Sequence, residues 1–326
     1  MNTKTAVLQK LEKSKGKPIS GNAMAMKLGV SRTAVWKAVC SLRKDGHEIK
    51  GGSGRGYILS EKSDKLTAEG VRANLKQKSD IVCFDSIDST NKEAMRLALN
   101  EPEDTILVIA NTQTSGKGRM GRTFFSPPDT GVYFSFLFRP KFDVSKSVIV
   151  TAAAATAVCR GIEKATGKVC SIKWVNDIYL GDKKICGILT EAVSGFESGA
   201  INYLIVGIGI NCNTENFPEI AGNNAGNLET EISRNRLVAE IANIFLPMTE
   251  NMTPGIFIEY YRSHSNVIGK KILIYPAGDL GKQDAKGTPA LVKGIRDDGG
   301  LIVEYPSGQN DVLTSGEISI RTADKA

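Results

Sequence analysis

The stretch that most restricts what this chain can fold into is Gly116 to Arg122, GKGRMGR, which is followed by TFFSPP. Gly116, Gly118 and Gly121 satisfy G-x-G-x-x-G, the fingerprint of dinucleotide-binding folds. In those folds the third glycine opens a helix whose amino terminus receives the pyrophosphate. Here Pro127–Pro128 follows, and a helix cannot run through two prolines. A dinucleotide-binding fold built on this loop is therefore excluded.

Other phosphate-binding loops do not fit this stretch either. No V-A-I-K or H-R-D follows for a kinase, and no G-x-x-x-x-G-K-[ST] occurs for a P-loop. Lys117, Arg119 and Arg122 instead place three cations on a flexible backbone, where burial without partners would be costly. Two interpretations remain at this point, a solvated basic turn and a loop that closes on an anion.

Length and cysteine usage limit the class of protein. A chain of 326 residues suits two or three domains, and no apolar run is long enough to span a bilayer. The amino terminus returns to lysine too early for a signal peptide, so we expect a cytoplasmic protein. Six cysteines without a C-x-x-C pair, beside two histidines, predict reduced thiols and no zinc site.

Positive charge is concentrated at the amino-terminal end. Residues 1–65 contain fourteen Lys and Arg against five Asp and Glu, a balance of +9. Since the whole chain carries +7, the remaining residues are close to neutral. This asymmetry indicates a polyanionic partner for the amino-terminal region alone.

The amino-terminal region predicts a helix-turn-helix unit. Apolar residues at helical spacing predict a first helix over Thr3–Lys13. Ser20 can cap a second helix that is broken at Gly29, and Ser31 can cap a third that is stopped by Gly46. Two helices joined by a short glycine turn are the arrangement in which the second helix enters the DNA major groove.

The segment after the third helix, HEIKGGSGRGYILSE, alternates apolar residues around a glycine-rich tip and predicts a hairpin, or wing. Near the start of the third helix, Arg32 could read a guanine edge and Lys37 could contact a phosphate. The predicted DNA contacts are Ser31, Arg32, Thr33 and Lys37, with Arg55 at the tip of the wing. A helical protein-interaction module with a solvated basic face is the alternative.

Beyond a polar linker at Lys62–Lys65, helical and strand patterns alternate. Helices are expected over Thr67–Leu75, over NKEAMRLALN with Ser89 as its cap, and over Ser147–Ala165. Strands are expected in IVCFDSI, TILVIANTQ, GVYFSFLFR, SIKWVND, KKICGILTEAV and NYLIVGIGIN. The order predicts an α+β domain whose sheet is largely built from neighbouring strands.

Two polar motifs of this central region have competing interpretations. DSTN (Asp88–Asn91) is either a plain helix N-cap or part of a pocket for a neutral polar ring. KWVND and GDKKICGIL bring Lys173, Asp177 and Lys184 near one end of the sheet. Each motif alone resembles a surface charge or a hairpin turn. The glycine loop and these motifs would rarely occur together, in this order along the chain, by accident.

The carboxy-terminal region predicts two helices and then a small β-structure. The helices are expected over Arg234–Leu246 and Pro254–Ser263. Short strands follow in KKILIYP, PALVKGIRDDGGLIVEYP and VLTSGEISIR, around turns such as Asp298–Gly299. This pattern predicts a small barrel of the SH3-like kind, which could buttress the preceding domain.

Residues 19 to 322 resemble a biotin protein ligase of the bifunctional kind that also represses the biotin operon. The motifs that carry the likeness are SRTAVWK, DSTN, TQTSGKGRMGR, KWVNDIYL, KKICGIL, GIGIN, RNRL (Arg234 to Leu237) and GEISIR (Gly316 to Arg321). Lipoate ligases share the catalytic fold but not this glycine loop. Lys117 stands where the family usually has arginine, which should weaken nucleotide binding because the fork geometry is lost. Val175 replaces the usual proline and should alter loop stiffness.

The resemblance implies a multidomain α+β protein: a winged helix-turn-helix at 1–62, a class II synthetase-like α+β catalytic domain at 66–268, and an SH3-like domain at 270–322. It implies biotin contacts from Ser89, Thr90, Asn91, Gln113, Gly116, Lys117, Gly118, Arg119 and Lys184. It implies ATP contacts from Lys117, Arg119, Arg122, Lys173, Asn176 and Asn211. For the SH3-like domain it implies contact with ATP or the acceptor protein, as the alternative to buttressing. Lys184, Arg119 and Asp177 would be catalytic, with Asp177 accepting or steering a proton or, alternatively, capping its turn.

The implied activity is a biotin–[acetyl-CoA-carboxylase] ligase that forms biotinyl-5′-AMP from biotin and ATP and then biotinylates a lysine of the biotin carboxyl carrier protein. Mg²⁺ would be bound through the phosphates, with no metal site made by the protein alone. The implied regulation is a homodimer that binds operator DNA when it carries biotinyl-AMP, and no membrane partner is expected. The alternatives are a ligase whose winged helix does not regulate, a ligand-sensing repressor without catalysis, and a lipoate-type ligase.

Overall fold

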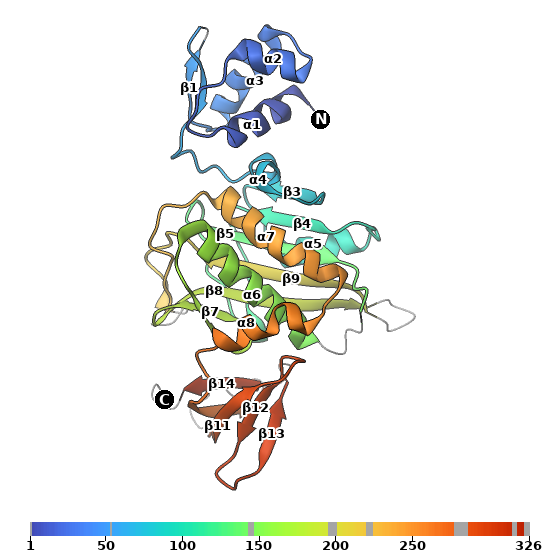
Figure 1. Ribbon diagram of the computed structural model, residues 1–326, viewed down its shortest axis with the longest axis vertical. Helices are drawn as coiled ribbons and strands as arrows, with labels where there is room; N and C mark the ends of the chain where they lie inside the picture. Colours follow the sequence, from blue (N-terminus) through green and yellow to red (C-terminus); the bar gives the residue numbers. More distant parts are fainter. Residues whose placement is uncertain are drawn as a thin grey trace.

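The computed structural model describes residues 2–52, 54–142, 147–194, 201–219, 224–276, 286–314 and 318–322. Three parts follow one another along the longest axis (Figure 1): a helical unit with a hairpin, a central sheet with its helices, and a carboxy-terminal sheet. Among the helices described, none combines the length and the apolar character that crossing a bilayer would require.

The amino-terminal unit has the predicted winged helix-turn-helix elements. They are α1 (Thr3–Lys13), α2 (Gly21–Leu28), α3 (Arg32–Lys44), β1 (Ile49–Gly52) and β2 (Gly56–Leu59). Ser20 Oγ accepts a hydrogen bond from the Ala23 N–H at 3.3 Å, and Ser31 Oγ accepts one from the Ala34 N–H at 3.1 Å. Gly29 ends α2 with a φ of +65°, a conformation that glycine adopts without steric cost. The predicted caps and the glycine break are confirmed.

The central sheet has seven strands in the order β3-β4-β5-β9-β8-β7-β6. Their bounds are β3 (Asp80–Phe84), β4 (Ile106–Ala110), β5 (Gly131–Phe138), β6 (Ser171–Lys173), β7 (Asp177–Leu180), β8 (Lys183–Ser194) and β9 (Ile201–Asn211). β3 pairs in parallel with β4, and every other pair is antiparallel. Most neighbours in the sheet are also neighbours in the chain, as predicted.

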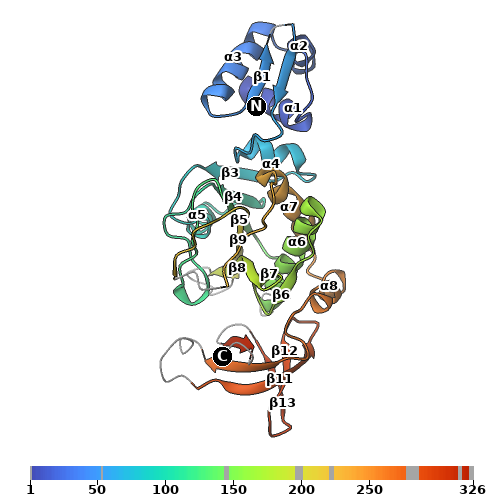
Figure 2. The same ribbon diagram turned by 90° about the vertical axis from the view of Figure 1, so that its left-hand side faces the viewer.

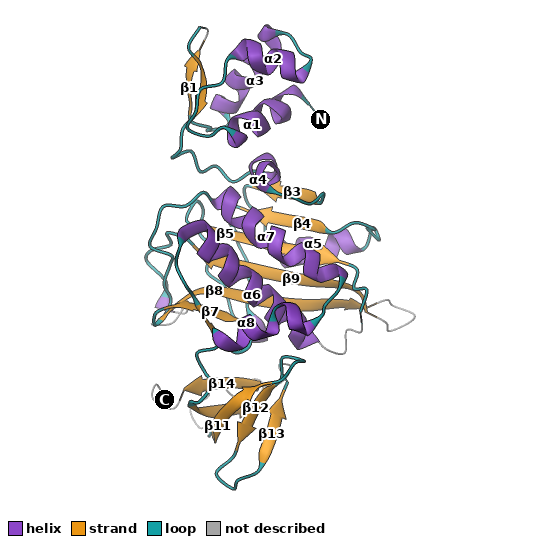
Figure 3. Ribbon diagram, viewed as in Figure 1, coloured by secondary structure: helices purple, strands orange, loops and turns teal. Residues whose placement is uncertain are grey.

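Helices cover both faces of this sheet. In the edge-on view of Figure 2, α5 (Thr90–Ala98) lies on one side, and α6 (Ser147–Thr166) and α7 (Arg234–Glu250) lie on the other. Ala94 and Ala98 of α5 pack with Val108 and Leu137 in one apolar cluster. The larger cluster joins the opposite face of the sheet to α6 and α7, and Figure 3 shows these helices lying across the strands. Two apolar faces explain why β5 is buried throughout.

Two predictions for this region are wrong in detail. SIKWVND is not one strand, because Lys173 pairs with Asp177 and the chain turns back at residues 174–176. Ser89 occupies the N-cap position of α5, but its side chain makes no capping hydrogen bond. The first N–H of the helix, that of Thr90, instead donates to Gln113 Oε1 at 2.9 Å. A long-range partner replaces the local cap.

The helical unit is joined to the central domain by α4 (Ala68–Asn74), which packs against α1. The linker before α4 is fixed by Arg234, whose side chain is only 4% exposed. The Arg234 guanidinium donates to Asp64 Oδ2 at 2.7 Å and to Asn111 Oδ1 at 2.7 Å. Its backbone N–H donates to Asp64 Oδ1 at 2.8 Å. The RNRL motif therefore anchors the linker to the central domain.

Replacing Arg234 by methionine should lower the free energy of unfolding by about 2 kcal/mol, because the Asp64 carboxylate and the Asn111 amide lose a charged partner. Urea unfolding of the full chain measures this change. Arg236→Met is the matched control, since Arg236 is exposed and lies 4.0 Å from Glu240. It should change stability by less than about 0.5 kcal/mol. Equal losses in the two variants would contradict the anchoring role.

The carboxy-terminal part follows 3-10 turn Pro254–Ile256 and α8 (Ile258–Ser263). It is a five-stranded antiparallel sheet in the order β13-β12-β11-β10-β14. The strands are β10 (Lys271–Pro276), β11 (Thr288–Ile295), β12 (Leu301–Glu304), β13 (Asn310–Leu313) and β14 (Ile318–Thr322). The predicted strands are present, whereas an SH3-like barrel stays a prediction. Gly316 and Glu317 of the GEISIR motif lie outside the described residues.

Candidate functional site

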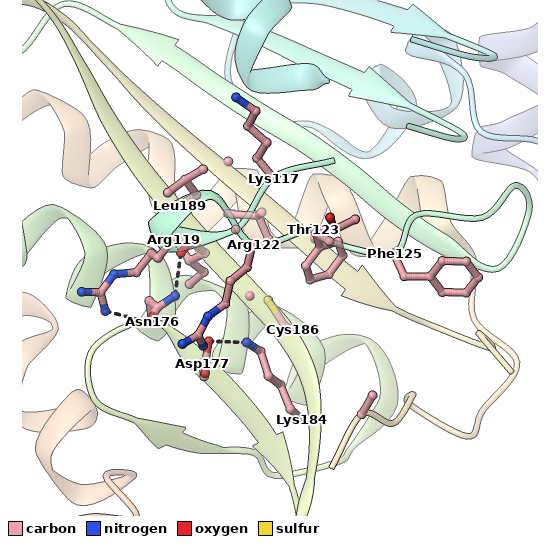
Figure 4. Close-up of a pocket in the computed structure, with 18 of the residues that line it drawn as sticks. Lys117, Arg119, Arg122, Thr123, Phe125, Asn176, Asp177, Lys184, Cys186 and Leu189 are labelled. Carbon is pink, nitrogen blue, oxygen red and sulfur yellow. Dashed lines mark hydrogen bonds and ion pairs between the residues drawn. The ribbon is translucent and has the colours of Figure 1, made fainter. Parts of the chain in front are cut away.

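A cavity of about 760 Å³ lies where β8 and β9 meet the glycine loop and the β6–β7 turn (Figure 4). Its lining contains most of the residues that the sequence motifs singled out. Those lining residues are Thr90, Gln113, Lys117, Gly118, Arg119, Arg122, Lys173, Asn176, Asp177, Lys184 and Asn211. The structure thus brings together motifs that are more than a hundred residues apart.

Glycines of β8 and β9 make room for side chains that pack closely on the sheet at the cavity. A Cβ atom at Gly209 would lie 2.5 Å from the Phe124 ring, and one at Gly187 would lie 3.3 Å from it. A Cβ at Gly207 would lie 2.0 Å from Asn91 Oδ1. Any larger residue would displace these side chains. The aromatic wall formed by Phe124 was not predicted, although FFSPP directly follows the glycine loop in the sequence.

One end of the cavity is neutral and polar. Gln113 Oε1 accepts hydrogen bonds from the N–H and the hydroxyl of Thr90, at 2.9 and 3.2 Å. Gln113 Nε2 donates to Ser126 Oγ at 3.0 Å. Buried Ser135 places its Oγ 2.7 Å from Thr90 Oγ1 and 2.6 Å from Asn91 Oδ1. These contacts fix the orientation of the Thr90 and Gln113 side chains, so this end is prepared for a neutral ligand group.

Three of the residues predicted to contact biotin are not exposed to the cavity. Ser89, Asn91 and Gly116 are buried, but none of them is in the cavity lining. Asn91 Nδ2 donates to Glu191 Oε2 at 2.6 Å, which ties α5 to β8. A Cβ at Gly116 would lie 2.6 Å from the Phe124 carbonyl oxygen, so the loop closes tightly there.

The other end of the cavity is charged. Lys184 Nζ forms an ion pair with Asp177 Oδ1 at 2.7 Å, and Arg119 Nη1 donates to Asn176 Oδ1 at 3.3 Å. Burial lowers the pKa of the Arg119 guanidinium, and the nearby Asp177 carboxylate opposes that shift. In Figure 4 the Arg122 side chain extends toward the Asp177–Lys184 pair. An anion that entered here would meet several cations at once.

The glycine loop itself is folded back on the cavity. A 3-10 turn spans Arg119–Gly121, and the Gly118 N–H donates to the Arg122 carbonyl at 2.7 Å. No α-helix follows the third glycine, in agreement with the exclusion of a dinucleotide fold. Lys117 is exposed, and in Figure 4 it points away from the Asp177–Lys184 pair. The loop therefore turns Arg119 and Arg122, rather than Lys117, toward the charged end.

A segment at 224–226 completes the wall beside Lys184, and the sequence analysis missed it. The Lys184 N–H donates to the Asn224 carbonyl at 2.7 Å, and the Gly226 N–H donates to the Lys184 carbonyl at 2.9 Å. Asn211 Nδ2 donates to the Gly226 carbonyl at 2.9 Å. Within the described part of the chain, the buried Asn211 Oδ1 has no hydrogen-bond partner, so it can accept one from a ligand.

The predicted DNA contacts lie on the outside of the amino-terminal unit. The exposed residues are Ser31, Arg32, Thr33 and Lys37 at the start of α3, and Arg55 between β1 and β2. The Ser31 oxygen also caps α3, which leaves its hydroxyl hydrogen for an external acceptor. The helix start and the wing thus both present donors to solvent.

Comparison with known proteins identifies two regions of the chain. Residues 83–211 match the model of the biotin/lipoate A/B protein ligase family, and residues 3–58 match a model described as HTH domain. The chain is 41% identical over 206 residues to the bifunctional ligase/repressor BirA of Bacillus subtilis. That alignment covers 62% of this chain and 63% of the relative, which is less than two thirds of its length.

Two further comparisons extend over more of the chain. The bifunctional ligase/repressor BirA of Escherichia coli is 28% identical over 315 residues, covering 94% of each chain. Among solved structures, the biotin protein ligase from Aquifex aeolicus in complex with biotin and ATP has a TM-score of 0.60 and 25% identity. It covers 76% of this chain and 100% of its own.

Proposed function

From its likeness to the biotin/lipoate A/B protein ligase family, we propose that the chain activates biotin with ATP and transfers biotin to a lysine of a carrier protein. One observation carries the proposal: the cavity joins a neutral, hydrogen-bonding end to a cationic end. Biotin has a neutral ring system and an anionic tail, so its two ends match those of the cavity. We assign the amino-terminal unit to residues 1–62, the catalytic unit to 66–268 with a class II synthetase-like fold, and an SH3-like unit to 270–322.

We assign the neutral end to the biotin rings. Thr90 and Gln113 would hydrogen-bond the polar ring edge, and Phe124, which packs on Gly209, would contact the apolar ring. The buried set of Ser89, Asn91 and Gly116 would support these residues from behind rather than touch the ligand. Gly118 and Lys117 would border the opening.

We assign the charged end to the biotin carboxylate and the nucleotide. In the first step the carboxylate oxygen attacks the α-phosphate of ATP, which forms biotinyl-5′-AMP and releases pyrophosphate. Two anions must approach one another, so Lys184, Arg119 and Arg122 would act as fixed cations that stabilise the crowded negative charge. Lys173, Asn176 and Asn211 would hold the rest of the nucleotide.

The residues present fit a Mg²⁺ ion that is carried by the phosphates. Asn211 offers an unpartnered buried oxygen, and Asn176 lines the same cavity. The described residues contain no group of three His, Cys, Asp or Glu that could hold a metal. Mg²⁺ prefers oxygen ligands and retains phosphates and waters among them. When bound, it would neutralise phosphate charge, with Asn176 and Asn211 as the protein groups near it.

In the second step a lysine amine of the acceptor attacks the mixed anhydride and expels AMP. The attacking amine must be neutral, so a base near the carbonyl would favour the step. Asp177 lies beside Lys184 at the charged end and is our candidate to accept or steer that proton. Capping the 174–176 turn is its alternative role.

The decisive experiment combines the purified chain, biotin, MgATP and the biotin carboxyl carrier protein of acetyl-CoA carboxylase. Intact-mass spectrometry should show the carrier gaining one biotinyl group. A carrier with its target lysine replaced by arginine, and a reaction with lipoate in place of biotin, are the matched controls. Labelling by lipoate but not by biotin would favour a lipoate-type ligase, and no labelling by either would refute the ligase proposal.

We further propose that the winged helix binds the operator of biotin genes as a homodimer when the ligase site holds biotinyl-AMP. The exposed donors of α3 and the basic charge of residues 1–65 support this. Operator footprinting with and without biotinyl-AMP distinguishes this repressor from a ligase whose winged helix does not regulate. Footprints that do not depend on the ligand would contradict the switch.

Lys37→Gln should weaken binding to all DNA sequences and reduce the slope of log K against log salt by about 1, since one phosphate contact is lost. Arg32→Gln should instead relax preference at one base position, at a cost of about 1–3 kcal/mol. Fluorescence anisotropy at several salt concentrations measures both effects. Lys13→Gln on α1 is the control with the same loss of charge. Variants at Arg32 and Lys37 that bind like the control would favour a protein-interaction module.

A further inference from the structure

The turn between β6 and β7, residues 174–176, is held in place from three directions. Its flanking residues Lys173 and Asp177 line the cavity together with Trp174 and Asn176 of the turn itself, so the position of the turn sets the position of two charged groups. From the sheet, the Asn176 side-chain amide donates to the Ile188 carbonyl at 2.9 Å. From α8, the buried Tyr261 hydroxyl donates to the Val175 carbonyl at 2.9 Å.

The third contact comes from the carboxy-terminal sheet. The Trp174 indole N–H donates to the Gly299 carbonyl at 2.9 Å, a bond that joins residues 125 apart in sequence. Trp174 is 4% exposed, so this N–H has no access to bulk water if the bond is lost. The cavity lining, as described, contains no residue of the carboxy-terminal sheet. Trp174 is thus a direct link between that sheet and the site.

Gly299 lies in the turn between β11 and β12, and contacts with neighbouring elements hold this turn in position. Gly299 has a φ of +84°, and an added Cβ would lie 3.0 Å from Val148 Cγ1 of α6. The Arg296 N–H donates to the Gly300 carbonyl at 2.8 Å, which closes the turn between β11 and β12. Arg262 of α8 donates to the Ile295 carbonyl at 2.7 Å. The acceptor for Trp174 is therefore fixed by the sheet and by two helices.

The contacts of Asn176 extend this link across the cavity. Asn176 Oδ1 accepts the hydrogen bond from Arg119 of the glycine loop. A continuous set of contacts runs from the carboxy-terminal turn through Trp174 and Asn176 to the loop that closes the charged end. A shift of Trp174 would therefore move Asn176 and Arg119 at the charged end of the cavity. Thr90 and Gln113 at the neutral end would stay in place, because Ser135 and Ser126 hold them.

We infer that Trp174 is a positioning residue through which the carboxy-terminal sheet sets the geometry of the nucleotide end of the site. The inference rests on the proposed function, because it assigns the charged end to ATP. It gives the carboxy-terminal sheet a role in nucleotide affinity without direct contact. The expected signature is a change in ATP affinity that is not accompanied by a change in biotin affinity.

The test is Trp174→Phe in the full chain, which keeps an aromatic ring and removes the N–H. The KM for ATP in pyrophosphate release should rise about tenfold, as expected for one lost buried hydrogen bond. The KM for biotin should stay within about twofold, because the polar end has separate supports. Trp36→Phe, the same substitution on exposed α3, is the matched control and should leave both constants unchanged.

A second variant changes Gly299, the acceptor of the Trp174 hydrogen bond. Gly299→Ala should displace the carbonyl through contact with Val148 and produce the same selective rise in the KM for ATP, without altering any cavity residue. This variant also decides the question if Trp174→Phe fails to fold. An unchanged KM for ATP, or equal increases for ATP and biotin, would overturn the inference. Absence of pyrophosphate release by the unmodified chain would instead refute the proposed ligase function.

Discussion

Replacing Lys184 by methionine is expected to slow biotinyl-AMP formation about 10³-fold, which is the size of effect seen when a preorganised electrostatic group is removed. Lys184 is the cation that forms an ion pair with Asp177 at 2.7 Å. Without it, the biotin carboxylate and the α-phosphate would meet beside an Asp177 carboxylate that has lost its ion-pair partner. Pyrophosphate release under saturating biotin and MgATP measures the rate.

Lys183→Met is the matched control for this variant, because Lys183 is the preceding residue of β8 and lies outside the cavity lining. Its rate should remain within about twofold of that of the unmodified chain.

Asp177→Asn separates the two chemical steps: adenylate should form normally, while transfer to the carrier lysine slows by about 10²-fold if Asp177 is the base. If Lys184→Met formed biotinyl-AMP at the full rate, Lys184 would have no role in the activation step. If Asp177→Asn transferred biotin at the full rate, Asp177 would not be the base, and capping of the 174–176 turn would remain as its role.

Local signals in the sequence were sufficient to predict most of the helices and strands. Ser20, Gly29 and Ser31 fixed the boundaries of α2 and α3, because caps and a left-handed glycine act within one turn of a helix. The same kind of signal failed at Ser89, where Gln113 from a later segment supplies the hydrogen bond. A cap made by a distant residue has no local pattern, so only the folded chain reveals it.

The β6–β7 turn shows why the rest of the site could not be predicted. Trp174 and Val175 are buried, apolar residues, and in a sequence they extend a strand pattern rather than interrupt it. They turn because Gly299 and Tyr261 hold them, and both partners lie far along the chain. Phe124 and the 224–226 segment were missed for the same reason. Phe124 packs on glycines of β8 and β9, and the 224–226 segment bonds to Lys184. These partners are distant in sequence and become neighbours only when the chain folds.

Replacing Arg119 by glycine is expected to increase release of biotinyl-AMP by roughly 10- to 150-fold, the equivalent of one hydrogen bond to a charged group. Arg119 connects the glycine loop to Asn176 across the charged end, and it lines the part of the cavity to which we assign the phosphate. With glycine at this position the loop would lose its cross-link and exclude water less completely. Rapid filtration of enzyme loaded with radiolabelled biotin measures the dissociation rate.

Escape of the adenylate should also change what the protein labels. Free biotinyl-AMP reacts with any exposed amine, so Arg119→Gly should biotinylate lysines of an added bystander protein that the unmodified chain leaves unlabelled. Arg119→Lys is the informative companion, because it keeps the charge and loses the planar fork, and it should release adenylate at an intermediate rate. If the lysine variant retained the adenylate fully, charge alone would hold the loop closed. If even the glycine variant retained it, the barrier to escape would have to lie in the floor and walls of the cavity, at Phe124 and the 224–226 segment, rather than in the loop.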